Sequence, residues 1–187
     1  MNIADQKQAL RERIKAAIAA IPPSERSALG AAAATRLRKH EAWTSSRQIL
    51  LFSPLADEPA IGDLLGDKSV ICIPRYVKES GDYEAAIISD PERDLVSGKF
   101  GILEAQPDCR SLALNQLDLV LVPGVAFAPC GARLGRGRGF YDRILKLVTG
   151  MKIGVAFDEQ IEATIPTEAH DQRVDGIITP TRWITVH

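Results

Sequence analysis

The sequence has few cysteines: Cys72, Cys109 and Cys130 are the three among its 187 residues. Three cysteines at wide spacing form neither a disulfide framework nor the paired spacing of a zinc site, so we expect neither. Low cysteine usage fits a reducing cytoplasm. Cys130 lies beside a glycine-rich segment, but no histidine is close to it in the sequence, so we do not expect it to act as a nucleophile.

Long hydrophobic runs and an excess of charge are also missing. No apolar run approaches the roughly 20 residues that a membrane span needs, and the charged, amphipathic N-terminus lacks the apolar core of a secretory signal. The formal net charge is −1, so any affinity for anions must be local. We therefore expect a cytoplasmic protein that binds neither nucleic acid nor membranes.

Two amphipathic segments at the start of the chain predict helices. Residues 2–21 carry apolar side chains at helical spacing, namely Ile3, Leu10, Ile14, Ile18 and Ile21. Pro22 and Pro23 end this helix, and Ser24 is expected to cap an alanine-rich second helix that runs to about residue 40.

Short apolar segments interrupted by helical patterns make up most of the remaining chain. They are residues 48–53, 70–75, 83–89, 117–124, 152–157 and 175–180. Strands that are apolar on both faces are typical of a sheet covered on both sides. The order of elements predicts an α/β fold in a single domain, 1–187, with a mostly parallel central sheet and helices on both faces. Residues 90–115 are expected to form a loop.

The most informative segment is GARLGRGRGFYDRIL, residues 131–145. Its alternating glycines and arginines combine a backbone that can approach a ligand closely with planar cationic donors that suit phosphate. A buried-strand pattern precedes it and a helical pattern follows, an order that places phosphate at a helix N-terminus. The alternative, a flexible basic surface loop, does not require the flanking strand, the aromatic pair or the acid. The segment matches neither the Walker A pattern nor GxGxxG.

Charged residues follow other predicted strands, at the edge where ligands bind in open α/β sheets. Asp57 and Glu58 could bind a polar heterocycle or cap the next helix, and the residues alone do not decide between these. Arg75 could bind an acid or pair with a surface carboxylate, and pairing is the more common role of such an arginine. Asp142 starts a helix, where an acid favours the macrodipole, although beside a phosphate loop it could also hold magnesium.

Lys7, Arg11 and Lys15 stand at positions i, i+4 and i+8 of the first helix. Like charges at this spacing repel one another mildly. A bound anion would relieve the repulsion, but the spacing alone favours a solvent-exposed face. The pair His170-Asp171 is also expected to be solvated. Since no G-x-S-x-G sequence is present, a hydrolase triad is not supported.

Residues 122–145 resemble the signature of the 5-formyltetrahydrofolate cyclo-ligase family, whose members are also called methenyltetrahydrofolate synthetases. Further segments resemble the family in the same order, namely residues 7–11, 53–58, 98–105, 153–160 and 170–179. The resemblance spans nearly the whole chain. It implies an ATP- and Mg²⁺-dependent closure of 5-formyltetrahydrofolate to 5,10-methenyltetrahydrofolate, with release of ADP and phosphate, in a cytoplasmic enzyme expected to be a monomer.

The resemblance also implies the site residues. For ATP they are Lys7, Arg11, Arg133, Leu134, Gly135, Arg136, Gly137, Arg138, Gly139, Phe140 and Tyr141. For the folate they are Ser53, Glu58, Arg136, Gly137, Arg138, Gly139 and Phe140. The catalytic side chains are Arg133, Arg136 and Tyr141, and the Mg²⁺ ligands are Asp142 and Asp171.

The chain departs from the family pattern at three places: Ala105, the segment 59–61, and Phe140, where tyrosine is usual. Two other functions are consistent with the sequence. One is a non-catalytic relative that binds folate or nucleotide, against which the intact run 133–142 argues. The other is an ATP-using enzyme with a different carbonyl substrate, which the altered segment after Glu58 leaves open.

Overall fold

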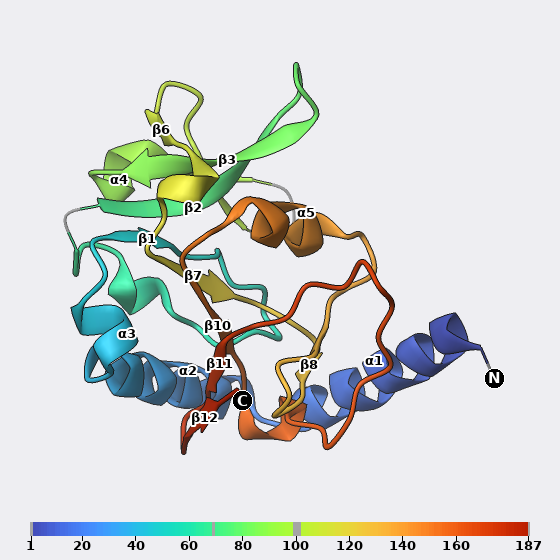
Figure 1. Cartoon of the computed structure of the whole chain (residues 1–187). Helices are drawn as coiled ribbons and strands as arrows, with labels where there is room; N and C mark the ends of the chain where they lie inside the picture. Colours follow the sequence, from blue (N-terminus) through green and yellow to red (C-terminus); the bar gives the residue numbers. More distant parts are fainter. Residues whose placement is uncertain (1, 69, 99–101, 187) are drawn as a thin grey trace.

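The computed structural model describes residues 2–68, 70–98 and 102–186 (Figure 1). The helices are α1 (Ile3–Ala19), α2 (Pro23–Arg38), α3 (Glu41–Thr44), α4 (Pro91–Asp94) and α5 (Phe140–Leu147). The short 3-10 helices are η1 (Gly62–Leu64), η3 (Leu114–Gln116) and η4 (Asp158–Gln160). The strands are β1 (Gln48–Leu50), β2 (Val70–Val77), β3 (Asp82–Ile88), β4 (Leu95–Ser97), β5 (Leu103–Ala105), β6 (Ser111–Leu112), β7 (Leu119–Val122), β8 (Ala126–Phe127), β9 (Arg133–Leu134), β10 (Met151–Val155), β11 (Gly176–Ile178) and β12 (Trp183–Thr185).

An eight-stranded sheet of order β12-β11-β10-β7-β1-β2-β3-β6 forms the centre of the molecule. The five strands from β11 to β2 pair in parallel, and the flanking strands pair antiparallel. Successive strand residues point to opposite faces: Leu119 and Leu121 pack with α2 and α3, whereas Val120 and Val122 pack with α5. The prediction of a mostly parallel sheet with helices on both faces is confirmed.

Helix α1 lies apart from these two layers and packs on a small hairpin formed by β8 and β9 (Figure 1). Leu10, Ile14 and Ile18 form the buried stripe that the spacing predicts, and they contact Ala126 and Leu134 of the hairpin. The apolar face of α1 thus fixes the strand that leads into the glycine segment. Among the described helices, none is both long and apolar enough to cross a bilayer.

The order of strands reverses at β1. The chain passes from β1 to β2 on one side, and later returns to place β7 and β10 on the other side. Two segments therefore leave the carboxyl edge of neighbouring parallel strands: residues 51–58 after β1 and residues 123–139 after β7. In open α/β sheets such a switch point is where a crevice forms and ligands bind.

Two expectations about local structure are wrong, and one hairpin was not predicted. Helix α2 begins at Pro23 with Pro22 as its cap and no side-chain capping bond, because proline is pre-organised for the first helical turn. Residues 90–115 contain the short helix α4 and the strands β4, β5 and β6. These strands have two or three residues each and are too short to show a period. The hairpin of β8 and β9 was missed for the same reason. Part of the family segment 98–105, residues 99–101, lies outside the described residues.

Gly30, in the middle of α2, allows the helix to approach the backbone that follows Glu58. A Cβ built at Gly30 would lie 2.5 Å from the Ala60 nitrogen and 2.8 Å from its oxygen. We expect Gly30→Ala to lower the free energy of unfolding by about 1–3 kcal/mol through overpacking, although alanine favours helices by about 1 kcal/mol. Denaturant titration measures this, with Gly62→Ala as the control, since no atom lies within 4 Å of a Cβ there. Equal stability of the two variants would contradict the close approach.

Candidate active site

A cavity of about 1170 Å³ opens at the carboxyl edge of the sheet, where the segments after β1 and β7 meet. The first segment contributes Ser53 and Glu58, and the second contributes Gly124, Arg136 and Arg138 among others; Gly137 does not line the cavity. The β2–β3 hairpin and residues 102–105 supply the opposite wall. The switch point of the sheet therefore does carry a large cavity, as the strand order predicts.

The backbone of the glycine segment adopts angles that favour glycine. Gly137 and Gly139 have φ values of 90° and 62°, in the left-handed region that disfavours side chains. Gly139 is the N-cap of α5, so the loop leads directly into the helix N-terminus. From α1, Arg11 donates through Nε to the Gly135 carbonyl at 2.9 Å. This contact ties the start of the chain to the loop.

Arg136 points across the cavity and joins its two halves. Its Nε and one terminal nitrogen donate to Glu58 Oε1 at 3.1 and 3.0 Å, and its terminal nitrogens also donate to Asp57 at 2.6 and 3.2 Å. Burial raises the pKa of the Glu58 carboxyl, although the Leu55 N–H and Arg136 oppose the shift. The guanidinium thus presents both of its forked edges to carboxylates, and Glu58 is the more buried of the two.

Arg133 is the most deeply buried charged group of the site, with 5% of its surface exposed. One terminal nitrogen donates to Asp142 Oδ1 at 2.7 Å, and the other lies 3.5 Å from the Pro123 carbonyl. Its Nε has no hydrogen-bond partner among the described residues. An unpartnered donor of this kind is costly in a protein interior, so the geometry favours an acceptor supplied by a ligand.

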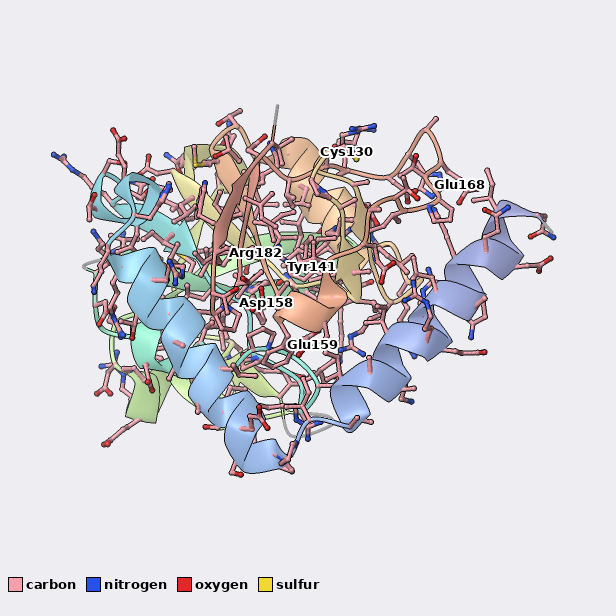
Figure 2. All side chains as sticks on the ribbon, turned by 90° about the horizontal axis from the view of Figure 1, so that it is seen from below. Cys130, Tyr141, Asp158, Glu159, Glu168 and Arg182 are labelled. Atoms are coloured by element: carbon pink, nitrogen blue, oxygen red, sulfur yellow. The ribbon has the colours of Figure 1, made fainter. Side chains whose placement is uncertain are left out.

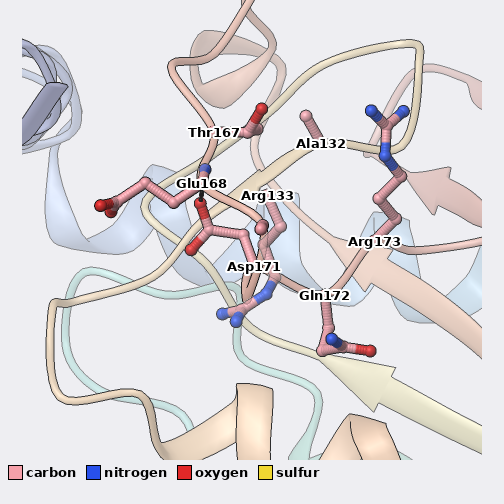
Figure 3. A pocket seen from close by; sticks show the side chains of 8 residues that line it. Ala132, Arg133, Thr167, Glu168, Asp171, Gln172 and Arg173 are labelled. Atoms are coloured by element: carbon pink, nitrogen blue, oxygen red, sulfur yellow. Dashed lines mark hydrogen bonds between the residues drawn. The ribbon is translucent and has the colours of Figure 1, made fainter.

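A second, smaller cavity of about 350 Å³ also has Arg133 in its wall (Figure 3). Residues 167–173, an irregular segment before β11, form most of this wall together with Ala132 and Arg133. In this view the Glu168 side chain extends away from Arg133, and the Asp171 carboxylate accepts from the Glu168 N–H at 2.7 Å. Arg133 therefore lines two cavities of different size.

Lys7 reaches this region from α1 and is buried, so the expectation of a solvent-exposed face is wrong at this position. Its ammonium donates to Glu168 at 2.9 Å and to Asp171 at 2.5 Å. Burial alone would lower the pKa of Lys7, but the bonds to the two carboxylates outweigh it and raise the pKa. Glu168 lies beside the N-terminal end of α1 in Figure 2. Lys15, two turns further on, is exposed as expected.

The other residues predicted for the site occupy its walls in different ways. Ser53 donates to the Leu103 carbonyl at 2.6 Å, while Arg138 and Phe140 line the larger cavity. Burial raises the pKa of the Tyr141 hydroxyl, so this group stays protonated and can act as a donor rather than as a base. Leu134 is different, because its side chain packs under α1 and it lines neither cavity.

The two acids predicted to hold magnesium are linked through the backbone of Gln172. Its N–H donates to Asp142 Oδ1 at 3.1 Å, and Asp171 precedes it in the chain. The hydrogen bonds of Asp142 involve Oδ1 and those of Asp171 involve Oδ2, while Asp171 Oδ1 lies 3.7 Å from His170 Nε2. Mg²⁺ is usually held by one or two carboxylates plus phosphate and water, so the pair fits. No group of three or more metal-ligating side chains occurs within the described ranges.

The sequence did not indicate two residues that complete these contacts. Glu168 and Gln172 lie in an irregular segment without periodicity, and their partners Lys7 and Asp142 are 161 and 30 residues away in the chain. Asp57 was considered for a ligand or a helix cap, but it pairs with Arg136. Arg75 follows the more common alternative, since it binds Glu84 and three backbone carbonyls.

Comparison with known proteins identifies the family of this chain. The sequence model of the 5-formyltetrahydrofolate cyclo-ligase family matches residues 3–180. The chain belongs to this family. The mouse 5-formyltetrahydrofolate cyclo-ligase is 30% identical, with 95% of each chain covered. The enzyme of the same name from Mycolicibacterium smegmatis is 33% identical over 75% of this chain and 77% of its own.

A solved structure extends the likeness to the fold. The NMR structure of Aquifex aeolicus 5,10-methenyltetrahydrofolate synthetase superposes with a TM-score of 0.84 at 29% identity, covering 97% of this chain and 93% of the other. The protein is therefore a cyclo-ligase by family, an enzyme of the ligase class, with the α/β fold of its relatives. Two of its three departures lie in the wall of the larger cavity: Ala105 ends β5, and Phe140 packs its ring 4.2 Å from that of Tyr83. The third, segment 59–61, does not line this cavity, and Ile61 is buried in the core.

Proposed function

We propose that this cyclo-ligase uses ATP and Mg²⁺ to close 5-formyltetrahydrofolate to 5,10-methenyltetrahydrofolate, with release of ADP and phosphate. The observation that carries the proposal is the placement of Arg133. This buried residue lines both cavities, and its Nε lacks a protein acceptor within the described residues. Such a group suits a phosphoryl group that passes from one substrate to the other.

The reaction needs an activated formyl oxygen, because this oxygen is a weak nucleophile and a poor leaving group. Transfer of the γ-phosphoryl from ATP forms a P–O bond to the formyl oxygen, breaks the bond to ADP, and gives an imidate phosphate. The neighbouring arylamine nitrogen then attacks the formyl carbon, loses its proton, and displaces phosphate as the C–O bond breaks. Phosphoryl transfer of this kind depends mainly on positioning and charge stabilisation.

The described side chains provide both requirements. We assign the folate to the larger cavity, with Glu58 as the acceptor for the amino and ring N–H groups of the pterin and with Ser53 and Phe140 nearby. ATP is assigned to Lys7, Arg11 and the loop 133–141, with its phosphates towards the smaller cavity. Arg133 and Arg136 would balance negative charge on the transferred group, and the protonated Tyr141 hydroxyl would donate to it. Bound Mg²⁺ would neutralise phosphate charge.

A cyclisation assay tests this proposal directly. The purified protein is expected to raise methenyl-folate absorbance only when ATP and Mg²⁺ are both present. Binding of ATP and folate without turnover would instead indicate a non-catalytic relative. Phosphate release with another carbonyl compound from a substrate panel, but not with 5-formyltetrahydrofolate, would indicate a different substrate.

Asp142→Asn is expected to raise the Mg²⁺ concentration that turnover requires, with a smaller effect on folate binding. Asp142 accepts from Arg133 and Gln172 through Oδ1, and the amide would lose the charge that a hard cation prefers. We expect the Mg²⁺ concentration at half-maximal activity to rise about tenfold, which corresponds to about 1.4 kcal/mol. Asp118→Asn, at the amino edge of the sheet where Asp118 binds backbone N–H groups, is the control. Identical Mg²⁺ curves for wild type and Asp142→Asn would refute the assignment.

We further propose that the whole chain, 1–187, works as one cyclo-ligase-like domain and as a monomer. All the residues assigned to the two substrates lie on one edge of one sheet or on α1, which packs beside it. Sedimentation analysis of the active protein tests the oligomeric state.

A further inference from the structure

Gln160 is a buried polar residue to which the reaction proposed above gives no role. It ends η4, directly after β10, and 2% of its surface is exposed. The segment 153–160 belongs to the family resemblance, but no substrate contact was assigned to it. A fully buried amide needs partners for two donors and one acceptor, so its bonds show what it holds in place.

Both polar atoms of the Gln160 side chain form hydrogen bonds with backbone groups. Oε1 accepts from the Phe157 N–H at 2.8 Å, and Nε2 donates to the Gly124 carbonyl at 2.8 Å and to the Val125 carbonyl at 3.1 Å. Phe157 follows β10, whereas Gly124 and Val125 follow β7. The side chain therefore clamps together the two backbones that leave neighbouring strands at the carboxyl edge.

The clamped turn leads to Arg133 through short contacts. The Val125 N–H donates to the Leu134 carbonyl at 2.7 Å, directly beside Arg133 in β9. A Cβ on Gly124 would lie 3.3 Å from Arg133 Cγ and 2.7 Å from the Phe127 ring, so the turn and the arginine stem pack without spare room. Phe127 in turn is the β8 partner of Arg133. A shift of the Gly124–Val125 turn must therefore move the Arg133 stem.

We propose that Gln160 is a positioning residue, whose amide fixes the turn after β7 and thereby sets the place of the Arg133 guanidinium for phosphoryl transfer. This inference depends on the proposed function of Arg133. Gln160 itself contacts neither cavity, since it lines neither of them. Its effect should appear in the catalytic step rather than in the binding of either substrate.

The test uses Gln160→Glu, which keeps the size of the side chain but loses both donors, and Gln160→Met, which removes all three bonds without adding charge. We expect kcat to fall about 10- to 100-fold in each, since a displacement on the order of 1 Å can cost 100-fold. The Kd values of a non-hydrolysable ATP analogue and of 5-formyltetrahydrofolate, measured by calorimetry, should change less than about threefold, because the lost interaction acts only in the transition state.

Combination with Arg133→Lys separates positioning from general destabilisation. If Gln160 acts through Arg133, the loss in kcat from Gln160→Glu should largely disappear in the Arg133→Lys background. Ser46→Ala is the matched control: Ser46 is also buried and binds a backbone carbonyl, at 2.6 Å, but at the amino edge of the sheet. It should lower the melting temperature and leave kcat unchanged when both are measured well below that temperature.

Additive losses, weakened Kd values in proportion to kcat, or an unchanged kcat in both Gln160 variants would each overturn the inference. A wild-type protein without ATP-dependent cyclisation would refute the proposed function itself. An active wild type whose Gln160 variants keep full kcat would refute this inference alone.

Discussion

Arg133→Ala should abolish most ATP turnover while the protein stays folded. The variant removes a guanidinium that is 3% exposed at its side chain, is paired with Asp142 at 2.7 Å, and lines both cavities. Loss of a preorganised donor to charge that develops in the transition state typically lowers kcat by about 100- to 1000-fold, or about 2.7–4 kcal/mol. Steady-state kinetics with ATP as the varied substrate measure the loss.

Two further variants make the result interpretable. Arg133→Lys keeps a positive charge but not the planar fork, so it should stay folded and recover only part of the activity. Arg38→Ala removes a half-buried arginine at the end of α2 that pairs with Asp67 and lines neither cavity, and it should behave as wild type. Circular dichroism confirms folding in each case. Wild-type kcat/KM for ATP in a folded Arg133→Ala would exclude a role of this residue in phosphoryl transfer.

The second large effect is expected from Glu58→Gln, which should weaken folate binding and leave ATP binding intact. The carboxylate can accept paired hydrogen bonds from the pterin, whereas the amide presents a donor in place of one acceptor. An unpaired buried donor costs about 1–3 kcal/mol, or roughly 5- to 150-fold in Kd. Calorimetric titration of each ligand separately measures the two affinities.

Asp57→Asn is the matched control, because Asp57 binds the same arginine but is more exposed. If its loss of folate affinity equals that of Glu58→Gln, the effect passes through Arg136 and not through direct contact. A fall in ATP affinity with unchanged folate affinity in Glu58→Gln would show that the two substrates are assigned to the wrong cavities.

The pKa of Glu58 predicts the accompanying change in stability. Because burial raises this pKa above its usual value of 4.5, the folded state binds the proton more tightly than the unfolded state. Ionised Glu58 therefore costs stability at neutral pH, and the cost is relieved as pH falls through the raised pKa. Glu58→Gln lacks this cost but also loses the ion pair with Arg136, so it should stay about as stable as wild type while it binds folate less well.

Much of the fold followed from patterns that burial imposes on the sequence. The strands at the centre, such as β7, are buried on both faces and so read as continuous apolar runs. The period of Leu10, Ile14 and Ile18 in α1 has the same cause. Elements of two or three residues, such as β9, bury too few side chains to leave a pattern, and their position follows from tertiary contacts instead.

The glycine loop was recognisable because its chemistry is local, with donors, glycines and helix start in one segment. The ion-pair partners of the charged side chains could not be recognised in the same way. Lys7 looked solvent-exposed because its carboxylates lie 161 and 164 residues away, and a sequence period cannot show contacts of that range. The ambiguity at Asp57 and Glu58 had a similar cause, since their partner Arg136 lies 79 and 78 residues away. Residue types thus indicated which charged side chains gather at this edge of the sheet, while the fold shows which of them form ion pairs.

The charges around the two cavities compensate one another: Arg136 faces two carboxylates, Lys7 faces two, and Arg133 faces one. With the substrates placed as proposed above, a phosphate or a pterin would enter by exchange of partners and not by simple attraction to a bare cation. Exchange requires side chains to separate first, and association that waits for such a rearrangement proceeds below the diffusional rate. It also means that stray inorganic anions, which bring no donors for the released carboxylates, gain little by entering.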